Sequence, residues 1–175
     1  MFPLPTRLAL GMLFGASLLA SSAGLPRDAG EIRVRVRPGG HYLRTEGGVG
    51  VLRLLECTPP GQDVGGETRM ARGQPAVARN GLGDVLEIPA DAAPPNTPVQ
   101  IIRHAGRPYR WVSANAGGPV RSAALTIDLA GCAAAPAMTI VRFTGGEWED
   151  VGGQLQGTAI TAQLPHLSIY AVAGN

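Results

Sequence analysis

Three histidines and two cysteines are the side chains in this sequence best suited to hold a metal ion. His41, His104 and His166 lie far apart in the chain, and no two of them have the close spacing of a His-x-x-x-His site. No histidine lies near either cysteine, and the sequence lacks a Gly-x-Ser-x-Gly motif and a phosphate-binding glycine loop. We therefore predict no metal ion and no cofactor, and a metal-dependent periplasmic enzyme is the weakest functional alternative.

Cys57 and Cys132 are the only cysteines, and 75 residues separate them. Two cysteines in an exported protein most often form one disulfide. Closing a loop of this length contributes on the order of 4 kcal/mol by the chain-entropy estimate, provided that the bond is unstrained. The alternative is a pair of buried free thiols.

The segment 31–37 alternates strictly between apolar and basic side chains, which is typical of a half-buried strand. Its basic face consists of Arg33, Arg35 and Arg37. Side chains at this spacing stand about 7 Å apart on one face of a strand. Such a row is suited to contact anionic cell-wall polymer or lipopolysaccharide phosphate. More often it is a solvated face that discourages edge-to-edge strand pairing.

The first 23 residues have the three parts of an export signal. A positively charged start ends at Arg7, an apolar run of 13 residues follows over 8–20, and small residues precede Gly24. A helix of that length spans about 20 Å, short of the ~30 Å hydrocarbon core of a membrane. We predict a cleaved signal peptide over 1–23, export to the periplasm or cell surface, and no transmembrane anchor after cleavage. An uncleaved anchor is the alternative.

The charge of the chain argues against a nucleic-acid partner. All 15 basic residues are arginine, which, together with abundant Ala, Gly and Pro, is typical of the codon bias of a GC-rich bacterium. Removal of Arg7 with the signal leaves 14 basic residues against 13 acidic ones. Electrostatic binding to nucleic acid needs a larger basic excess.

The remainder of the chain has the pattern of a β-sandwich or barrel, because short apolar stretches alternate with Gly and Pro clusters. Strands are predicted over 31–37, 49–56, 84–88, 99–103, 109–113, 120–129, 138–143, 158–164 and 167–172. The polar stretch 58–80 is expected to form a long loop or an irregular edge. We therefore predict a single all-β domain over 24–175, with N-terminal strands and the long loop over 24–80.

Three stretches within 81–175 carry a family pattern. The segment 85–99 is similar to an opening strand, a proline-alanine turn and a second strand, and Trp148 followed by Asp150-Val151 is similar to a late strand. The segment 166–172, HLSIYAV, is similar to a closing strand. The region resembles the zonula-occludens and netrin-receptor type β-sandwich and its relative, the autoproteolysis-inducing (GAIN-like) domain of adhesion receptors. The expected fold is an immunoglobulin-like antiparallel β-sandwich.

The same resemblance implies a reaction for His166 and Ser168. In self-cleaving relatives the histidine is the general base and the hydroxyl attacks the preceding carbonyl, giving an ester that water hydrolyses. The reaction needs a strained turn, which Pro165 would help to form. The structural alternative is a closing strand in which Ser168 only packs or hydrogen-bonds. In that strand Tyr170 and Val172 lie on one face, and Leu167, Ile169 and Ala171 lie on the other.

These features favour a non-enzymatic binding or structural module of the bacterial cell envelope, whose partner is a protein or an envelope polymer. The sandwich family that this region resembles consists mostly of domains that mediate interactions. The main alternative is a self-processing β-sandwich that cleaves before Ser168 using His166 and Ser168.

Overall fold

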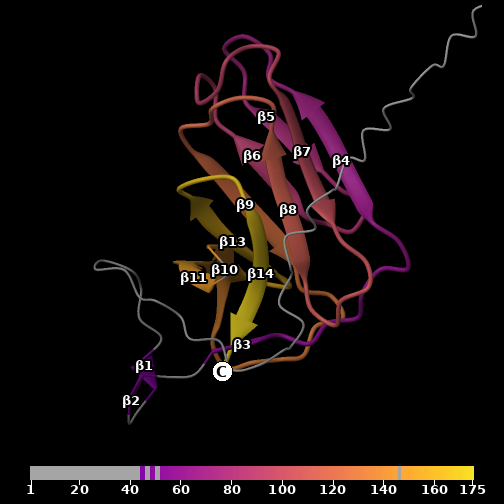
Figure 1. Cartoon of the computed structure of the whole chain (residues 1–175), viewed down its shortest axis with the longest axis vertical. Helices are drawn as coiled ribbons and strands as arrows, with labels where there is room; N and C mark the ends of the chain where they lie inside the picture. The colour runs from indigo at the N-terminus through magenta and orange to yellow at the C-terminus, as the bar shows by residue number, and fades with distance from the viewer. Residues whose placement is uncertain (1–43, 46–47, 50–51, 146) are drawn as a thin grey trace, which may run out of the picture.

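The computed structural model describes residues 44–45, 48–49, 52–145 and 147–175 (Figure 1). The predicted signal peptide over 1–23 and the arginine row Arg33, Arg35 and Arg37 lie outside the described residues. The first described elements, β1 (Arg44–Thr45) and β2 (Gly48–Val49), form a short antiparallel pair of their own.

The larger of the two main sheets has seven antiparallel strands. Its order is β11 (Glu147–Gly152), β10 (Met138–Thr144), β14 (Ile169–Gly174), β8 (Trp111–Ala116), β7 (Pro98–Arg103) and β4 (Val64–Arg69). A short strand, β3 (Arg53–Leu54), also pairs with β14 near the end of the chain. Figure 1 shows β4, β7, β8 and β14 side by side across the front of the molecule.

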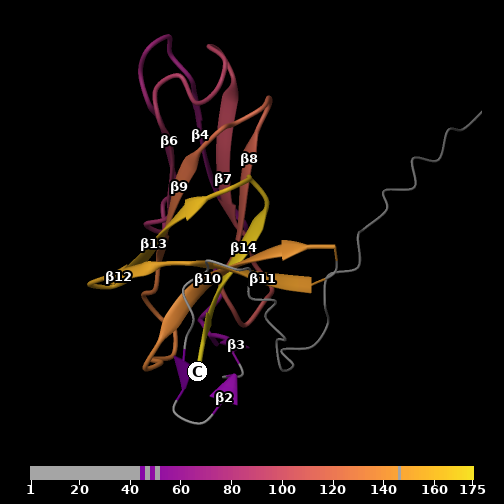
Figure 2. The ribbon, with the colours of Figure 1, turned by 90° about the vertical axis from the view of Figure 1, so that its left-hand side faces the viewer.

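The smaller sheet has five strands, also antiparallel. Its order is β12 (Gln154–Gln156), β13 (Ala159–Leu164), β9 (Ala123–Asp128), β6 (Val85–Ile88) and β5 (Ala76–Arg79). In the turned view of Figure 2, β6, β9 and β13 lie on the opposite side from β7 and β8. The described residues contain no helix. The prediction of an all-β fold with antiparallel sheets is therefore confirmed, and the two sheets have the arrangement of a β-sandwich.

The main core lies between the two sheets, because the strands bury every second side chain. In β7 the inward residues are Val99 and Ile101, and in β9 they are Leu125 and Ile127, all with no exposed surface. Residues of both sheets belong to this single cluster. Burial of each such side chain contributes about 1.5–3 kcal/mol, so this alternation drives the sheets together.

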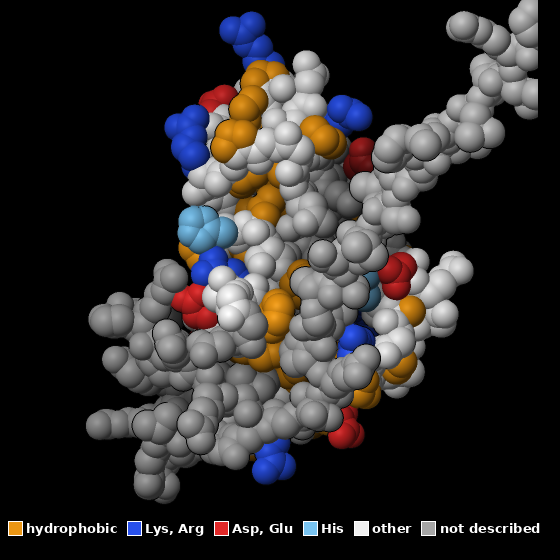
Figure 3. Space-filling view, viewed as in Figure 1, with side chains coloured by type: hydrophobic (Ala, Val, Ile, Leu, Met, Phe, Trp, Pro, Cys, Tyr) orange, Lys and Arg blue, Asp and Glu red, His pale blue; other side chains and the backbone are white. Residues whose placement is uncertain are grey.

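A second apolar cluster lies on the other face of the seven-stranded sheet. Trp111 alternates with the core residue Val112 on β8, so it points away from the main core. It packs edge-to-face on Trp148, with ring centroids 5.4 Å apart. Figure 3 shows hydrophobic side chains along the middle of this face and charged side chains toward its periphery. The outer face is thus partly a second core.

The prediction of a long loop over 58–80 is wrong where the structure has β4 and β5. Both are edge strands, so the part of the prediction that named an edge holds. Gly66 on β4 is needed because a Cβ there would lie 1.8 Å from the carbonyl oxygen of Arg79 on β5. Polar residues and glycines hid β4 (VGGETR) from a pattern based on buried side chains, and β5 (AVAR) is only four residues long. The sequence also missed the short exposed strand β12.

Candidate functional site

The closing segment holds the two residues for which self-cleavage is the alternative function. The Ser168 hydroxyl donates a hydrogen bond to the carbonyl oxygen of Phe143 on β10, at 3.0 Å. The carbonyl oxygen of Ser168 accepts from the amide of Ala114 on β8, at 2.9 Å. Ser168 is therefore bonded to both strands that flank β14, while the side chain of His166 is exposed.

His166 is held through its backbone and not through its ring. The hydroxyl of Tyr170 donates a hydrogen bond to the carbonyl oxygen of His166. Tyr170 is completely buried, and this burial raises the pKa of its hydroxyl to about 12. A tyrosine that bonds the backbone a few residues upstream is the arrangement called the tyrosine corner in immunoglobulin-like sandwiches. The bond fixes the turn that enters β14.

The predicted faces of the closing strand are confirmed with one exception. Tyr170 and Val172 belong to the main core, whereas Ala171 and Ile169 belong to the outer cluster. Leu167 was expected with the outer residues but packs against the main core. The reason is that β14 begins only at Ile169, so strand alternation does not extend to Leu167.

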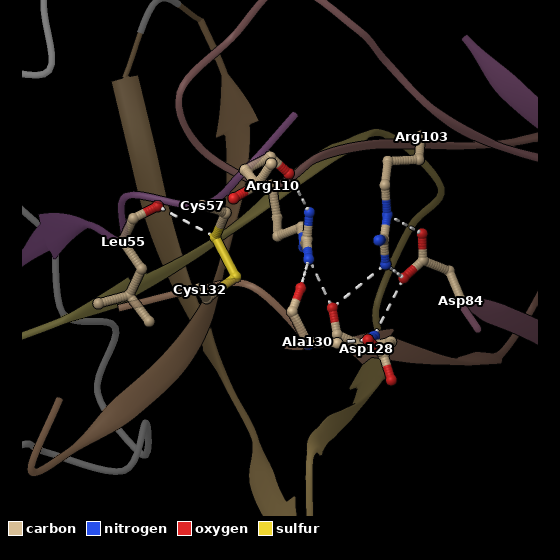
Figure 4. Close-up of a disulfide and its surroundings, with 9 residues drawn as sticks. Leu55, Cys57, Asp84, Arg103, Arg110, Asp128, Ala130 and Cys132 are labelled. Atoms are coloured by element: carbon tan, nitrogen blue, oxygen red, sulfur yellow. Dashed lines mark hydrogen bonds and ion pairs between the residues drawn. A yellow bond between two sulfur atoms is a disulfide. The ribbon is translucent and has the colours of Figure 1, made fainter. Parts of the chain in front are cut away.

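Cys57 and Cys132 form a disulfide, as predicted. The two residues also make an isolated antiparallel bridge, which joins the segment after β3 to the segment after β9. The bond therefore links the N-terminal part of the described chain to the five-stranded sheet. Its surroundings are drawn in Figure 4.

Beside the disulfide, Arg103 and Arg110 contact carboxylate and backbone carbonyl oxygens (Figure 4). Arg103 makes a two-pronged contact with Asp84, including a bond of 2.7 Å from its Nε to Oδ2. Arg110 donates to the carbonyl oxygens of Thr58 at 2.8 Å, of Asp128 at 3.2 Å, and of Ala130. Desolvation lowers the pKa of Arg110. These groups bind one another and the backbone, so the cluster supports the fold.

A different set of side chains, on or directly beside three neighbouring strands, forms a hydrogen-bonded chain. Asp63 lies directly before β4, His104 directly after β7, and Ser113 within β8. The Nδ1 atom of His104 is 2.8 Å from Asp63 Oδ2, and its Nε2 atom is 2.6 Å from Ser113 Oγ. This is the atom order of an Asp–His–Ser relay. We call these three residues the relay.

The carboxylate of Asp63 determines how the relay is protonated. Its other oxygen accepts from the amide of Ala105 at 2.8 Å, and this bond and the contact with His104 lower the pKa of Asp63. An ionised carboxylate only accepts hydrogen bonds, so Nδ1 of His104 carries a proton. In the neutral imidazole Nε2 is then free to accept the hydroxyl proton of Ser113.

Sequence reasoning missed the relay, because no local motif contains it. His104 follows Asp63 by 41 residues and precedes Ser113 by 9. Only the pairing of β4, β7 and β8 brings the three together. His166 and Ser168, which the self-cleavage alternative would make base and nucleophile, have the separate partners described above.

Among the residues that the structure describes, no group of three or more histidines, cysteines and acidic residues is arranged to hold a metal ion. Within that same part of the chain, no helix has the length and apolar character needed to cross a membrane. Comparisons with protein-family models, curated proteins and solved structures find no significant match for the chain.

Proposed function

We propose that this protein is an exported binding or structural module of the bacterial cell envelope. The observation that carries the proposal is the disulfide between Cys57 and Cys132, which ties the N-terminal segment into the antiparallel fold. Disulfides persist in oxidising compartments such as the periplasm and are rare in the cytosol. The bond thus supports the same compartment as the signal-like residues 1–23.

The proposed architecture is an immunoglobulin-like sandwich of the zonula-occludens and netrin-receptor type, related to the GAIN-like domain. The bond from Tyr170 to the His166 carbonyl supports this assignment, since such a corner is a feature of immunoglobulin-like sandwiches. A rigid sandwich suits a module that presents its faces to a protein or to an envelope polymer. Self-processing before Ser168 is the rival function.

Cell fractionation of a bacterium that expresses the whole chain tests the proposed compartment. We expect the protein in the periplasmic or envelope fraction, with an N-terminus at Gly24 within a residue or two. Non-reducing peptide mapping should then recover Cys57 linked to Cys132. Cytoplasmic protein that retains Met1 and carries two free thiols would overturn the proposal.

Binding is tested separately by cosedimentation with purified lipopolysaccharide and with isolated cell-wall sacculi. If an anionic polymer is the partner, replacing Arg33, Arg35 and Arg37 by glutamine weakens the binding, because the arginines supply the positive charge. The control replaces Arg69, Arg72 and Arg79, which lie on or between β4 and β5, by glutamine. Equal loss in both variants would point to nonspecific charge attraction.

A further inference from the structure

We propose that Ser113 is a nucleophile, activated by His104 and positioned through Asp63, that takes an acyl group from carboxylic esters with an apolar acyl part. This inference goes beyond the proposed binding role and does not depend on it. It rests on the geometry of the relay and on the side chains that surround Ser113.

In the relay, the hydroxyl contacts a base, and the base contacts a carboxylate that orients it, as nucleophilic catalysis requires. The base, Nε2 of His104, is 2.6 Å from the Ser113 hydroxyl, and the orienting carboxylate of Asp63 is 2.8 Å from Nδ1. These distances lie within the hydrogen-bonding range expected for a nucleophile, its base and the group that orients the base. The 2.8 Å bond from the Ala105 amide fixes the carboxylate in turn.

Backbone pairing between strands aligns the His104 imidazole with the Ser113 hydroxyl. Ser113 lies in the middle of β8, and the amide of His104 donates to the carbonyl oxygen of Trp111 at 2.9 Å. The position of the imidazole relative to β8 is therefore set by a ladder bond two residues from the serine. Ser113 is thus held by a paired strand, and Asp63 and His104 each lie directly beside the end of one; side chains on strands are held more precisely than those on loops.

A serine directly before the adjacent strand β14 shows how such a hydroxyl is satisfied without a base. Ser168 donates to a backbone carbonyl, that of Phe143. Ser113 instead has an imidazole nitrogen as its partner, and that imidazole contacts a carboxylate that is 57 % exposed. The fold gains little from an ion pair at so exposed a site. The arrangement is better explained by activation of the hydroxyl.

The neighbours of Ser113 favour an apolar acyl group. Ile102 on β7 and Ile169 on β14 are its directly paired residues on the two sides. Both are partly exposed, and paired side chains on one face of a sheet lie about 4.5–5.5 Å apart. Ser113 itself is 8 % exposed, so an ester carbonyl that reaches its Oγ must approach between these two isoleucines, and its acyl chain packs against them.

In the proposed reaction, Nε2 of His104 takes the hydroxyl proton as Ser113 Oγ forms a bond to the ester carbonyl carbon. The bond from that carbon to the alkoxy oxygen then breaks, and the alcohol leaves with the proton from Nε2. The acyl group remains as an ester on Ser113. Water, deprotonated by His104, attacks this ester, and the carboxylic acid leaves as Oγ regains its proton.

Labelling of the purified, disulfide-bonded protein with an alkyl fluorophosphonate tests the nucleophile. Oγ forms a bond to phosphorus and fluoride leaves, so peptide mapping by mass spectrometry identifies the modified residue. We expect the label on Ser113 and none on Ser113→Ala. Since a positioned general base contributes about 10²–10⁴-fold, His104→Gln should slow labelling at least about 100-fold.

Ser168→Ala is the matched control, because it removes a hydroxyl that lies directly before the neighbouring strand β14 and leaves the relay intact. Its labelling rate should equal that of the native protein. Asp63 acts only through His104. Asp63→Asn should therefore slow labelling in the native background and have no further effect in His104→Gln, an interdependence that general destabilisation would not produce.

A cysteine variant keeps the test decisive if a variant of the relay folds poorly. In Ser113→Cys the new thiol is the only free one, because Cys57 and Cys132 are joined. Its alkylation by iodoacetamide should be at least about tenfold faster than that of Ser168→Cys, because an adjacent base promotes the reactive thiolate. A folded native protein that is not labelled at Ser113, or equal alkylation rates in the two variants, would overturn the proposal.

Discussion

Arg103, the last residue of β7, forms a buried ion pair with Asp84, the residue directly before β6. The pair therefore connects the seven-stranded sheet to the five-stranded sheet. The two side chains are 4 % and 0 % exposed. Asp84 also accepts hydrogen bonds from the side chain of Asn80 at 2.7 Å and from the amide of Asp128 at 3.0 Å. Several partners thus compensate the burial of its charge.

Removing one member of this pair should be strongly destabilising. Asp84→Asn or Arg103→Met leaves the other charge buried without its partner, which typically costs about 3–5 kcal/mol. The free energy of unfolding in urea measures this cost. Arg69→Met is the control, since Arg69 is exposed and its replacement should change stability by less than about 0.5 kcal/mol. Native-like stability of both single variants would contradict a supporting role for the pair.

The disulfide should make a large contribution to stability. Replacing both Cys57 and Cys132 by serine removes a link across 75 residues, and we expect a loss on the order of 4 kcal/mol, measured by urea unfolding. Reductant should destabilise the native protein by a similar amount and leave the serine variant unchanged. If reductant shifts the unfolding midpoint of both proteins equally, the effect does not come from this bond.

Tyr170→Phe should lower the stability of the fold by an amount that depends on pH. Below pH 10 it loses one hydrogen bond, that to the His166 carbonyl, which costs about 1 kcal/mol. The folded pKa of Tyr170 is raised from 10.0 to about 12, so the native protein should lose stability as the pH rises through this interval. Tyr170→Phe should lack the part of this loss of stability that comes from ionisation of Tyr170. Tyr109→Phe, which also removes the hydroxyl of a buried tyrosine, is the control for the assay.

The mature protein should be a single uncleaved chain. The Ser168 hydroxyl is bonded to the Phe143 carbonyl, and most hydroxyls in such strands have only this structural role. Cleavage would release eight residues, Ser168 to Asn175, which would remain paired through β14 and escape detection on a native gel. Denaturing mass spectrometry separates the two masses. Finding that peptide, and losing it in Ser168→Ala, would make self-processing the function.

The sequence by itself determined the all-β class and most of the central strands. Inward residues such as Val99, Ile101, Leu125 and Ile127 recur at every second position, and this period reports directly which side chains are buried. It also predicted the disulfide over the alternative of two free thiols, because the chain has only two cysteines to pair. Both inferences need no knowledge of which strands become neighbours.

Only the tertiary structure decided which polar residues meet. The edge strands β4 and β5 were not predicted. Gly66 is required because the backbone of Arg79 lies too close for a side chain, and such a contact between two strands leaves no local pattern in the sequence. Asp84 and Arg103 are 19 residues apart, and Asp63 and His104 are 41 apart. Local periodicity is the same whichever strands pair, so these contacts, and with them the candidate site, arise only from the sheet order and from the packing of one sheet on the other.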